Sequence, residues 1–220
     1  MGAIIVQKKW GAALVLCAVL LTGVRSVDAA EEIPSHIYEW VQSTARQGYY
    51  FNKEQIQYAV DTHGHIDLTK IVVPTLRIYD EIQIQDVVSK RRWRMLPLDG
   101  YGDLSGAAEY LLIDLAAGVV HVTVHEDLDS EWGTLTREEN AKEIPLASLS
   151  DKDVEKKFFD AIIHYAIGHQ EEMVRRSHGI LTDADRRALE EKKHPELAQT
   201  DNSHDKHAKK DKKEKKKKKE

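Results

Sequence analysis

The stretch EYLLIDLAAGVVHVTVHEDLDS, residues 109–130, constrains the fold more than any other part of the sequence. Its first half, residues 110–115, is apolar on both faces, as expected for a strand inside a sheet. An Ala-Ala-Gly turn leads to a second strand whose alternation predicts two opposite faces. One face comprises Val120, Val122 and Val124, and the other comprises His121, Thr123 and His125. We expect the valines in the core and the second face free for contacts, because a slip by one residue would expose all three valines.

Four further segments are rich in aromatic or β-branched residues and predict strands. They are residues 36–43, 49–51, 56–60 and 68–79. The last of these contains Pro74, which has no backbone N–H and therefore indicates an edge strand or a bend. The glycine-containing segment 97–106 and the polar segment after Ser130 are interpreted as loops.

The C-terminal half predicts two helices. Ser150 is expected to cap an amphipathic helix that reaches about residue 178, where Gly179 ends it. Apolar residues recur at helical spacing along this helix, and such a stripe needs a sheet or helix to pack against. Thr182 indicates a second, strongly charged helix. Together with the strands, this order predicts an α+β domain.

Residues 1–30 have the three parts of a secretory signal. Lys8 and Lys9 precede an apolar run over residues 10–24, and small residues around Ala29 offer a cleavage site. The sequence therefore predicts export, with a periplasmic or secreted mature protein, and an uncleaved membrane anchor is the alternative. Cys17, the only cysteine, lies inside this segment, so the predicted mature chain has no disulfide.

Charge divides the chain unevenly. The formal net charge is −5, with +6 from residues 203–220 and +2 from residues 1–30, so the intervening body carries −13. An acidic body argues against nucleic acid as a partner. The Lys-rich tail is expected to be disordered, and it either neutralises the body or binds anionic lipid or cell-wall polymer. Weak metal binding by His204 and His207 is a third interpretation. The predicted division is 1–30 signal peptide, 31–178 α+β domain, 179–195 charged helical extension and 196–220 disordered tail.

One basic cluster interrupts the acidic body. It comprises Lys90, Arg91, Arg92, Trp93 and Arg94, at the end of a helix predicted over residues 81–94 with Asp80 as its cap. Cations at a helix C-terminus favour the helix dipole, which is the structural interpretation. The functional interpretation is an anion-binding patch in which Trp93 provides a stacking surface.

His63 and His65 are the two residues that we interpret as possible metal ligands. They are two residues apart, so on a strand they would share a face and could hold one ion. Their neighbours, Asp61 to Gly64, are typical of a turn, and a solvated loop is the alternative.

The order of features resembles the surface-adhesin protein E-like domain of bacterial envelope proteins over residues 36–168. The resemblance rests on the Trp40-Val41 strand, the Tyr49-Tyr50-Phe51-Asn52 strand, the Tyr110–Asp114 strand and the Ile144-Pro145 approach to a closing helix. It implies a small antiparallel sheet with a C-terminal helix on one face. In that family a cysteine often follows the Ile-Asp pair and ties the sheet to the helix; here Leu115 occupies the position.

Three function classes remain open from the sequence. The first is a non-enzymatic envelope module for binding or adhesion, with an envelope or extracellular protein as partner and no cofactor. The second is a periplasmic metal-binding protein that uses histidines and carboxylates. The third is an exported hydrolase, for which the sequence offers no pairing of a nucleophile with a base.

Overall fold

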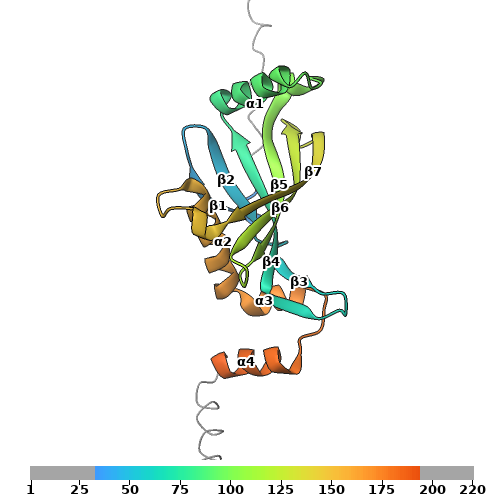
Figure 1. Ribbon diagram of the computed structural model, residues 1–220, viewed down its shortest axis with the longest axis vertical. Coiled ribbons are helices and arrows are strands. Elements are labelled where there is room, and N and C mark those ends of the chain that lie inside the picture. The colour runs from blue at the N-terminus through green and yellow to red at the C-terminus, as the bar shows by residue number, and fades with distance from the viewer. Residues whose placement is uncertain (1–32, 194–220) are drawn as a thin grey trace, which may run out of the picture. The chain divides into compact units, whose positions relative to one another are not determined.

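The fold is one antiparallel sheet of seven strands with helices against it (Figure 1), which confirms the predicted α+β class. The computed structural model describes residues 33–193, without the side chains of 140, 141 and 191–193. The strands are β1 (Tyr38–Ser43), β2 (Gln47–Asn52), β3 (Gln57–Val60), β4 (Ile66–Tyr79), β5 (Leu104–Asp114), β6 (Val119–Asp129) and β7 (Thr134–Pro145). They follow the order β1-β2-β4-β5-β6-β7, and β3 pairs with β4 beside β2. The predicted signal peptide and Lys-rich tail lie outside the described residues.

Strand β4 occupies the centre of the sheet, so the prediction of an edge strand at Pro74 is wrong. On one side β5 pairs with β4 from Lys70 to Ile78, and on the other β2 reaches Thr75 whereas β3 begins at Val72. Pro74 lies in the interval between these two neighbours. A residue without an N–H fits there because no strand partner stands opposite it on that side.

A β-bulge in β6 changes the predicted faces of the hairpin. Tyr110 pairs with Val124 but Leu111 pairs with Val122, so Thr123 is an extra residue relative to β5. Beyond such a bulge the alternation of side chains is reversed. Val120 and Val122 are buried as predicted, but Val124 is only half-buried, and His125 joins the core side of the sheet. The prediction that His125 shares a face with His121 and Thr123 is therefore wrong.

Two segments interpreted as loops belong to strands. Strand β7 covers most of the polar segment after Ser130, and it pairs along β6 from Leu128 to Val119. Strand β5 begins at Leu104, after a short 3₁₀ turn, η1 (Tyr101–Asp103), so Gly106 lies inside the sheet. Glycine is required at this position, since a Cβ would lie 2.3 Å from the carbonyl oxygen of Arg77 on β4.

The predicted amphipathic helix is two helices, α2 (Val154–Gly168) and α3 (Gln170–Arg176), which are separated at His169. Ser150 is not the N-cap of α2. That position belongs to Asp153, whose carboxylate accepts a hydrogen bond from the Ser150 N–H at 2.7 Å. A further 3₁₀ turn, η2 (Leu146–Ser148), connects β7 to this region.

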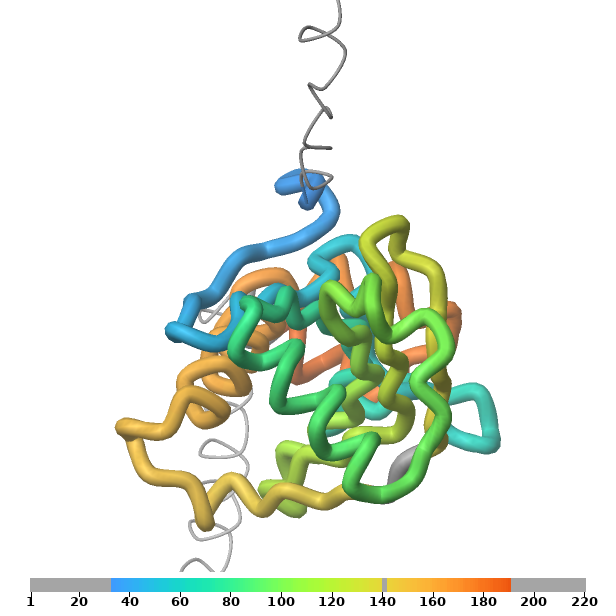
Figure 2. Tube along the Cα trace, turned by 90° about the horizontal axis from the view of Figure 1, so that it is seen from above, coloured from blue at the N-terminus to red at the C-terminus, as the bar shows by residue number. Residues whose placement is uncertain are grey.

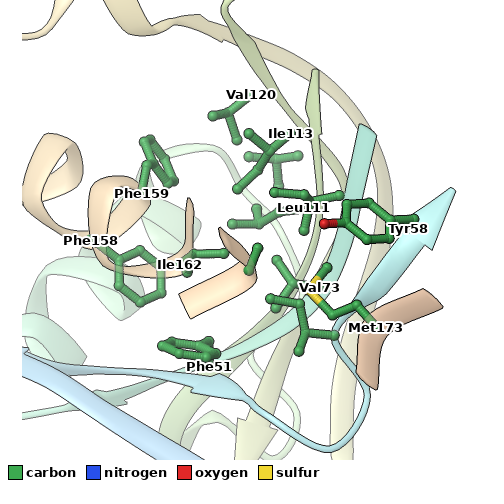
Figure 3. Close-up of a cluster of buried hydrophobic side chains, with 14 of the residues drawn as sticks. Phe51, Tyr58, Val73, Leu111, Ile113, Val120, Phe158, Phe159, Ile162 and Met173 are labelled. Carbon is green, nitrogen blue, oxygen red and sulfur yellow. The ribbon is translucent and has the colours of Figure 1, made fainter. Parts of the chain in front are cut away.

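The hydrophobic core lies between the sheet and helices α2 and α3 (Figure 3). The α2 side chains face those of the central strands, and Met173 of α3 closes the core next to Tyr58 of β3. The largest fully buried side chains are Phe51, Ile56, Ile71, Val73, Leu111, Ile113, Val120, Phe158, Phe159, Ile162 and Met173. Apolar packing thus joins the helix to the sheet, as expected for a chain without a nearby cysteine.

Helix α1 (Glu81–Trp93) lies at the opposite end of the sheet from α3 and α4 (Figure 1). Figure 2 is viewed from this end, so the α1 segment lies in front of the strands. The Asp80 carboxylate accepts from the Gln83 N–H at 2.9 Å, as predicted for its N-cap. Helix α4 (Asp183–Lys193) begins after Thr182, whose hydroxyl accepts from the Asp185 N–H. None of the helices within residues 33–193 is long and apolar enough to cross a membrane.

Candidate functional site: a charged pocket beside helix α1

A pocket of about 260 Å³ lies between α1 and the core side of β4, β6 and β7. Its lining combines cations, carboxylates and a few apolar groups: Tyr79, Gln83, Val87, Lys90, Arg91, Arg94, Leu96, His125, Asp127 and Glu138. A larger hollow of about 440 Å³ lies near α3 and Leu189 but is lined mostly by exposed side chains. We take the smaller pocket as the candidate site because buried ionised groups converge on it.

His125 stands between two carboxylates. Its Nδ1 lies 3.1 Å from Glu109 Oε1, and its Nε2 lies 3.2 Å from Asp127 Oδ1. Glu109 is the direct cross-strand partner of His125, and Asp127 is two residues further along β6 on the same face. The hydrogen bonds to Asp127 and Glu109 raise the pKa of His125 to about 9, so the imidazolium is the dominant form at neutral pH.

Arg77 connects Glu109 to helix α2. Its Nε donates to Glu109 Oε2 at 2.8 Å, and its two terminal nitrogens donate to both Glu155 oxygens at 2.8 and 3.1 Å. The guanidinium also lies 5.0 Å from the centre of the Tyr49 ring. Burial alone would raise the pKa of Glu109, but the charge of Arg77 and the hydrogen bond from His125 outweigh it and hold that pKa at about 2.

Asp127 also contacts a second group of side chains, on η1 and α1. The Tyr101 hydroxyl donates to Asp127 Oδ2 at 2.6 Å, and Arg91 Nη1 lies 3.8 Å from the same oxygen. Arg91 stacks 4.1 Å from the Tyr101 ring centre and donates two hydrogen bonds to the Pro97 carbonyl. Burial, followed by the bond to Asp127, raises the pKa of Tyr101 to about 12, which keeps its hydroxyl protonated.

These pKa shifts fix the protonation states of His125, Glu109, Asp127 and Tyr101 near neutral pH. His125 carries a proton that two carboxylates hold in place, so it is a poor general base. Glu109 has no proton to donate, and opposing burial, hydrogen bonds from His125 and Tyr101 lower the pKa of Asp127. A preorganised set of fixed charges is suited to electrostatic recognition rather than to proton transfer.

The predicted anion patch is split between the pocket and the surface. Arg91 turns inward and is neutralised by Asp127, whereas Lys90 and Arg94 line the pocket. Lys90 Nζ also lies 2.8 Å from Asp86 Oδ2 on the same helix. Arg92 and Trp93 point into solvent outside the pocket. Binding of an anion by these residues stays a prediction, and the five side chains do not form one patch.

The other two residues of the predicted contact face lie away from His125. His121 lies on the opposite side of β6, with its Nδ1 3.4 Å from Glu143 Oε1 on β7. The exposed Thr123 donates its hydroxyl to the Tyr110 carbonyl at 2.9 Å, across the bulge. The structure therefore places one of the three residues in the candidate site and leaves two on the outer face.

His63 lies in a turn between β3 and β4, and His65, directly before β4, forms an isolated parallel β-bridge with Ile180. Asp61 organises this turn, because its Oδ1 accepts from the backbone N–H groups of both histidines at 2.8 Å. The two ring centres are 6.5 Å apart. Across residues 33–193, no three or more His, Cys, Asp or Glu side chains are grouped to hold a metal ion. Metal binding at this turn stays a prediction.

Sequence reasoning did not identify Arg77, Glu109, Tyr101 or Asp127 as members of one site. A signal was present, since Arg77 and Glu109 are the only charged residues in the mainly apolar stretches 71–79 and 107–113. Charged residues are seldom buried unless paired, so two such interruptions indicate a buried ion pair. The bulge that brings His125 to them has no comparable signal.

No protein-family model, curated protein or solved structure matches the chain. The resemblance to the surface-adhesin protein E-like domain therefore stays a prediction. Leu115, where that resemblance implies a cysteine, lies in the turn after β5 and donates its backbone N–H to the Thr69 carbonyl.

Proposed function

We propose that this protein is an exported, non-enzymatic binding module of a bacterial cell envelope, and that it binds an acidic group of an envelope or extracellular protein partner at the pocket beside α1. The observation that carries the proposal is the fixed charge of the pocket. His125 is flanked by two carboxylates at 3.1 and 3.2 Å, and its raised pKa keeps it cationic at neutral pH.

The distribution of charge at the pocket supports an acidic ligand. Asp127 already accepts from His125 and Tyr101 and lies beside Arg91, so its charge is satisfied within the protein. Lys90 and Arg94 stand at the exposed side of the lining, where Glu138 is the opposing carboxylate. Lys90 is paired with Asp86 and Arg91 with Asp127. Arg94 is an exposed cation of the lining, and it attracts a carboxylate and disfavours a basic ligand.

Site-specific photocrosslinking tests this proposal. A photoreactive amino acid replaces Gln83, which lines the pocket, in the full-length protein expressed with its native envelope. We expect a discrete adduct with a partner protein, and we expect Lys90→Glu combined with Arg94→Glu to reduce it at least about tenfold. The matched control, Lys152→Glu with Lys157→Glu, reverses two exposed cations elsewhere and should leave the adduct intact. An adduct that survives both double substitutions would show that the pocket charges do not bind the partner.

Two parts of the proposal concern residues outside the described range. Export predicts that a C-terminally tagged precursor appears in the envelope or outside the cell at reduced mass. A tagged protein of full precursor mass in the cytoplasm would contradict it. Binding of anionic lipid or cell-wall polymer by the Lys-rich tail predicts that deletion of residues 203–220 weakens envelope association; unchanged association would rule out that role.

A further inference from the structure

The C-terminal end of α1 displays two large apolar side chains between cations. Trp93 and Met95 are 91% and 92% exposed, and they alternate with the exposed Arg92 and Arg94. We call residues 92–95 the α1 tip. Other exposed large hydrophobic side chains, such as Ile167 at 68%, are less exposed.

The backbone holds the α1 tip in a defined conformation. The Met95 N–H donates to the Arg92 carbonyl, and the Leu96 N–H donates to the Arg91 carbonyl, both at 3.0 Å. This is the Schellman pattern, in which the residue after the helix end adopts a left-handed conformation and is usually glycine. Met95 adopts it with φ of 55°. The Met95 side chain makes this left-handed backbone unfavourable, and burial does not offset the cost because the side chain is almost fully exposed. This combination points to a role of Met95 in contacts with another surface.

A buried anchor directly precedes the tip. Arg91 is 9% exposed, stacks on Tyr101 and donates twice to the Pro97 carbonyl beyond the tip. The Arg91 side chain therefore connects the last turn of α1 to the segment that follows the helix. Trp93 and Met95 project from a fixed base, so little conformational freedom of the backbone is lost on binding.

From these observations we infer that the α1 tip binds reversibly to the surface of an anionic lipid bilayer. Aromatic rings are favoured at the headgroup level, and flanking cations are attracted to lipid phosphates. The tip contains two cations and no carboxylate, and the next carboxylate along the chain is Asp99. The charge is thus complementary to an anionic bilayer and opposite to that of the acidic body. Of the tip residues only Arg94 also lines the pocket, whereas Arg92, Trp93 and Met95 lie outside it.

The expected affinity is weak. Each cation near an anionic surface raises partitioning about fivefold, and stable attachment takes a second signal in addition. The tip would orient the module at a membrane to which another part of the chain or a partner also holds it. Binding should fall steeply with salt, because the Debye length decreases from about 10 Å at 0.1 M to about 3 Å at 1 M.

A fluorescent label at the tip reports on the tip itself, so lipid binding by the Lys-rich tail alone would not change its signal. Full-length protein with Cys17→Ser and Met95→Cys carries an environment-sensitive dye and is mixed with vesicles of phosphatidylglycerol and phosphatidylcholine. We expect a blue shift and quenching by a quencher placed within the bilayer. The control label replaces Ile167, an exposed apolar residue on α2, and should stay in water. Vesicles of phosphatidylcholine alone should give little response.

Substitutions separate the tip from the pocket. Arg92→Gln should weaken vesicle partitioning about fivefold, whereas Lys152→Gln should not change the response of the tip label. If both labels stay in water while the protein sediments with vesicles, another part of the chain binds lipid and the inference is wrong. A further outcome is that the tip label shows no response to vesicles while Arg92→Gln abolishes the protein crosslink from Gln83. In that case the tip contacts a protein, and the inference is again wrong. A response of the tip label that is about fivefold weaker on Arg92→Gln, with an unchanged Gln83 crosslink, supports the inference independently of the proposed pocket function.

Discussion

His125 and Glu109 face each other across β5 and β6, with Nδ1 and Oε1 3.1 Å apart on the core side of the sheet. The pair exists because Thr123 is an extra residue in β6, which turns His125 towards the core. Without the bulge, Val124 would stand there and Glu109 would lack this partner. One inserted residue therefore converts an apolar position into the centre of a charged network.

The first prediction concerns the pH dependence of stability. The pKa of His125 is raised from 6.5 to about 9 in the folded protein, so folding favours the protonated ring. The resulting stabilisation is complete below about pH 6.5, declines as the pH rises, and is lost above about pH 9. We expect His125→Gln to cost up to about 3 kcal/mol at pH 6 and much less at pH 10. Urea unfolding of both proteins across this range measures the difference.

The control for this titration is His164→Gln, which changes an exposed histidine on α2. Its effect on the free energy of unfolding should stay within about 0.5 kcal/mol at every pH. An equal cost of His125→Gln at pH 6 and pH 10 would show that the side chain contributes through packing and not through its charge.

The second prediction concerns the coupling of Arg77 to Glu109. Arg77→Met leaves the Glu109 carboxylate, which is 12% exposed, without its strongest cation, and should cost about 3–5 kcal/mol. Glu109→Gln removes the buried charge that Arg77→Met leaves without a partner. The double variant should therefore lose about 1–3 kcal/mol less stability than the sum of the losses of the two single variants. Denaturant unfolding of the four proteins gives this coupling energy.

An exposed ion pair provides the comparison for Arg77. Arg186 and Asp183 on α4 are 56% and 85% exposed, and Arg186→Met should cost less than about 1 kcal/mol. Additive single effects at Arg77 and Glu109 would mean that the two side chains act separately despite their 2.8 Å contact.

The parts of the fold that the sequence predicted have strong local signals. The spacing of Phe158 and Ile162 and the Asp80 cap depend only on neighbours within a helical turn or two. The bulge at Thr123 has no such signal, because Val-His-Val-Thr-Val-His alternates equally well with or without it. Its register is determined by pairing with β5 and β7, and that pairing is a property of the folded sheet.

Strand β7 was missed for a related reason. Its central residues are Thr, Arg, Glu and Asn, which are typical of a loop, and most described side chains of the strand are exposed or half-buried. Such a composition suits an edge strand that should not pair with other molecules. The candidate site was missed because its members come from β4, β5, β6, α1 and η1. Their proximity depends on topology, although the isolated charges at Arg77 and Glu109 were visible in the sequence.

The third prediction concerns Gly106 in β5. A Cβ there would lie 2.3 Å from the Arg77 carbonyl oxygen, which is backbone and cannot rotate away. Gly106→Ala should therefore separate β4 from β5 locally and cost at least about 2 kcal/mol. Gly102→Ala is the matched control, since a Cβ at Gly102 has no neighbour within 4 Å, and it should change stability by less than about 0.5 kcal/mol. Thermal or urea unfolding distinguishes the two, and equal effects would contradict the close approach.

The last prediction is that one substitution at the α1 tip raises stability and weakens membrane binding. Met95 has φ of 55°, a conformation that costs an L-residue about 1–2 kcal/mol and glycine almost nothing. Met95→Gly should thus stabilise the end of α1 by about 1 kcal/mol and slow hydrogen exchange of the amides of residues 94–96. Met95→Ala keeps the Cβ and the strain but removes the exposed side chain, so it should lack this gain. Both variants should bind anionic vesicles more weakly, as measured by sedimentation, because both lose the apolar group. A glycine variant that is no more stable than the alanine variant would show that the left-handed backbone of Met95 carries no cost.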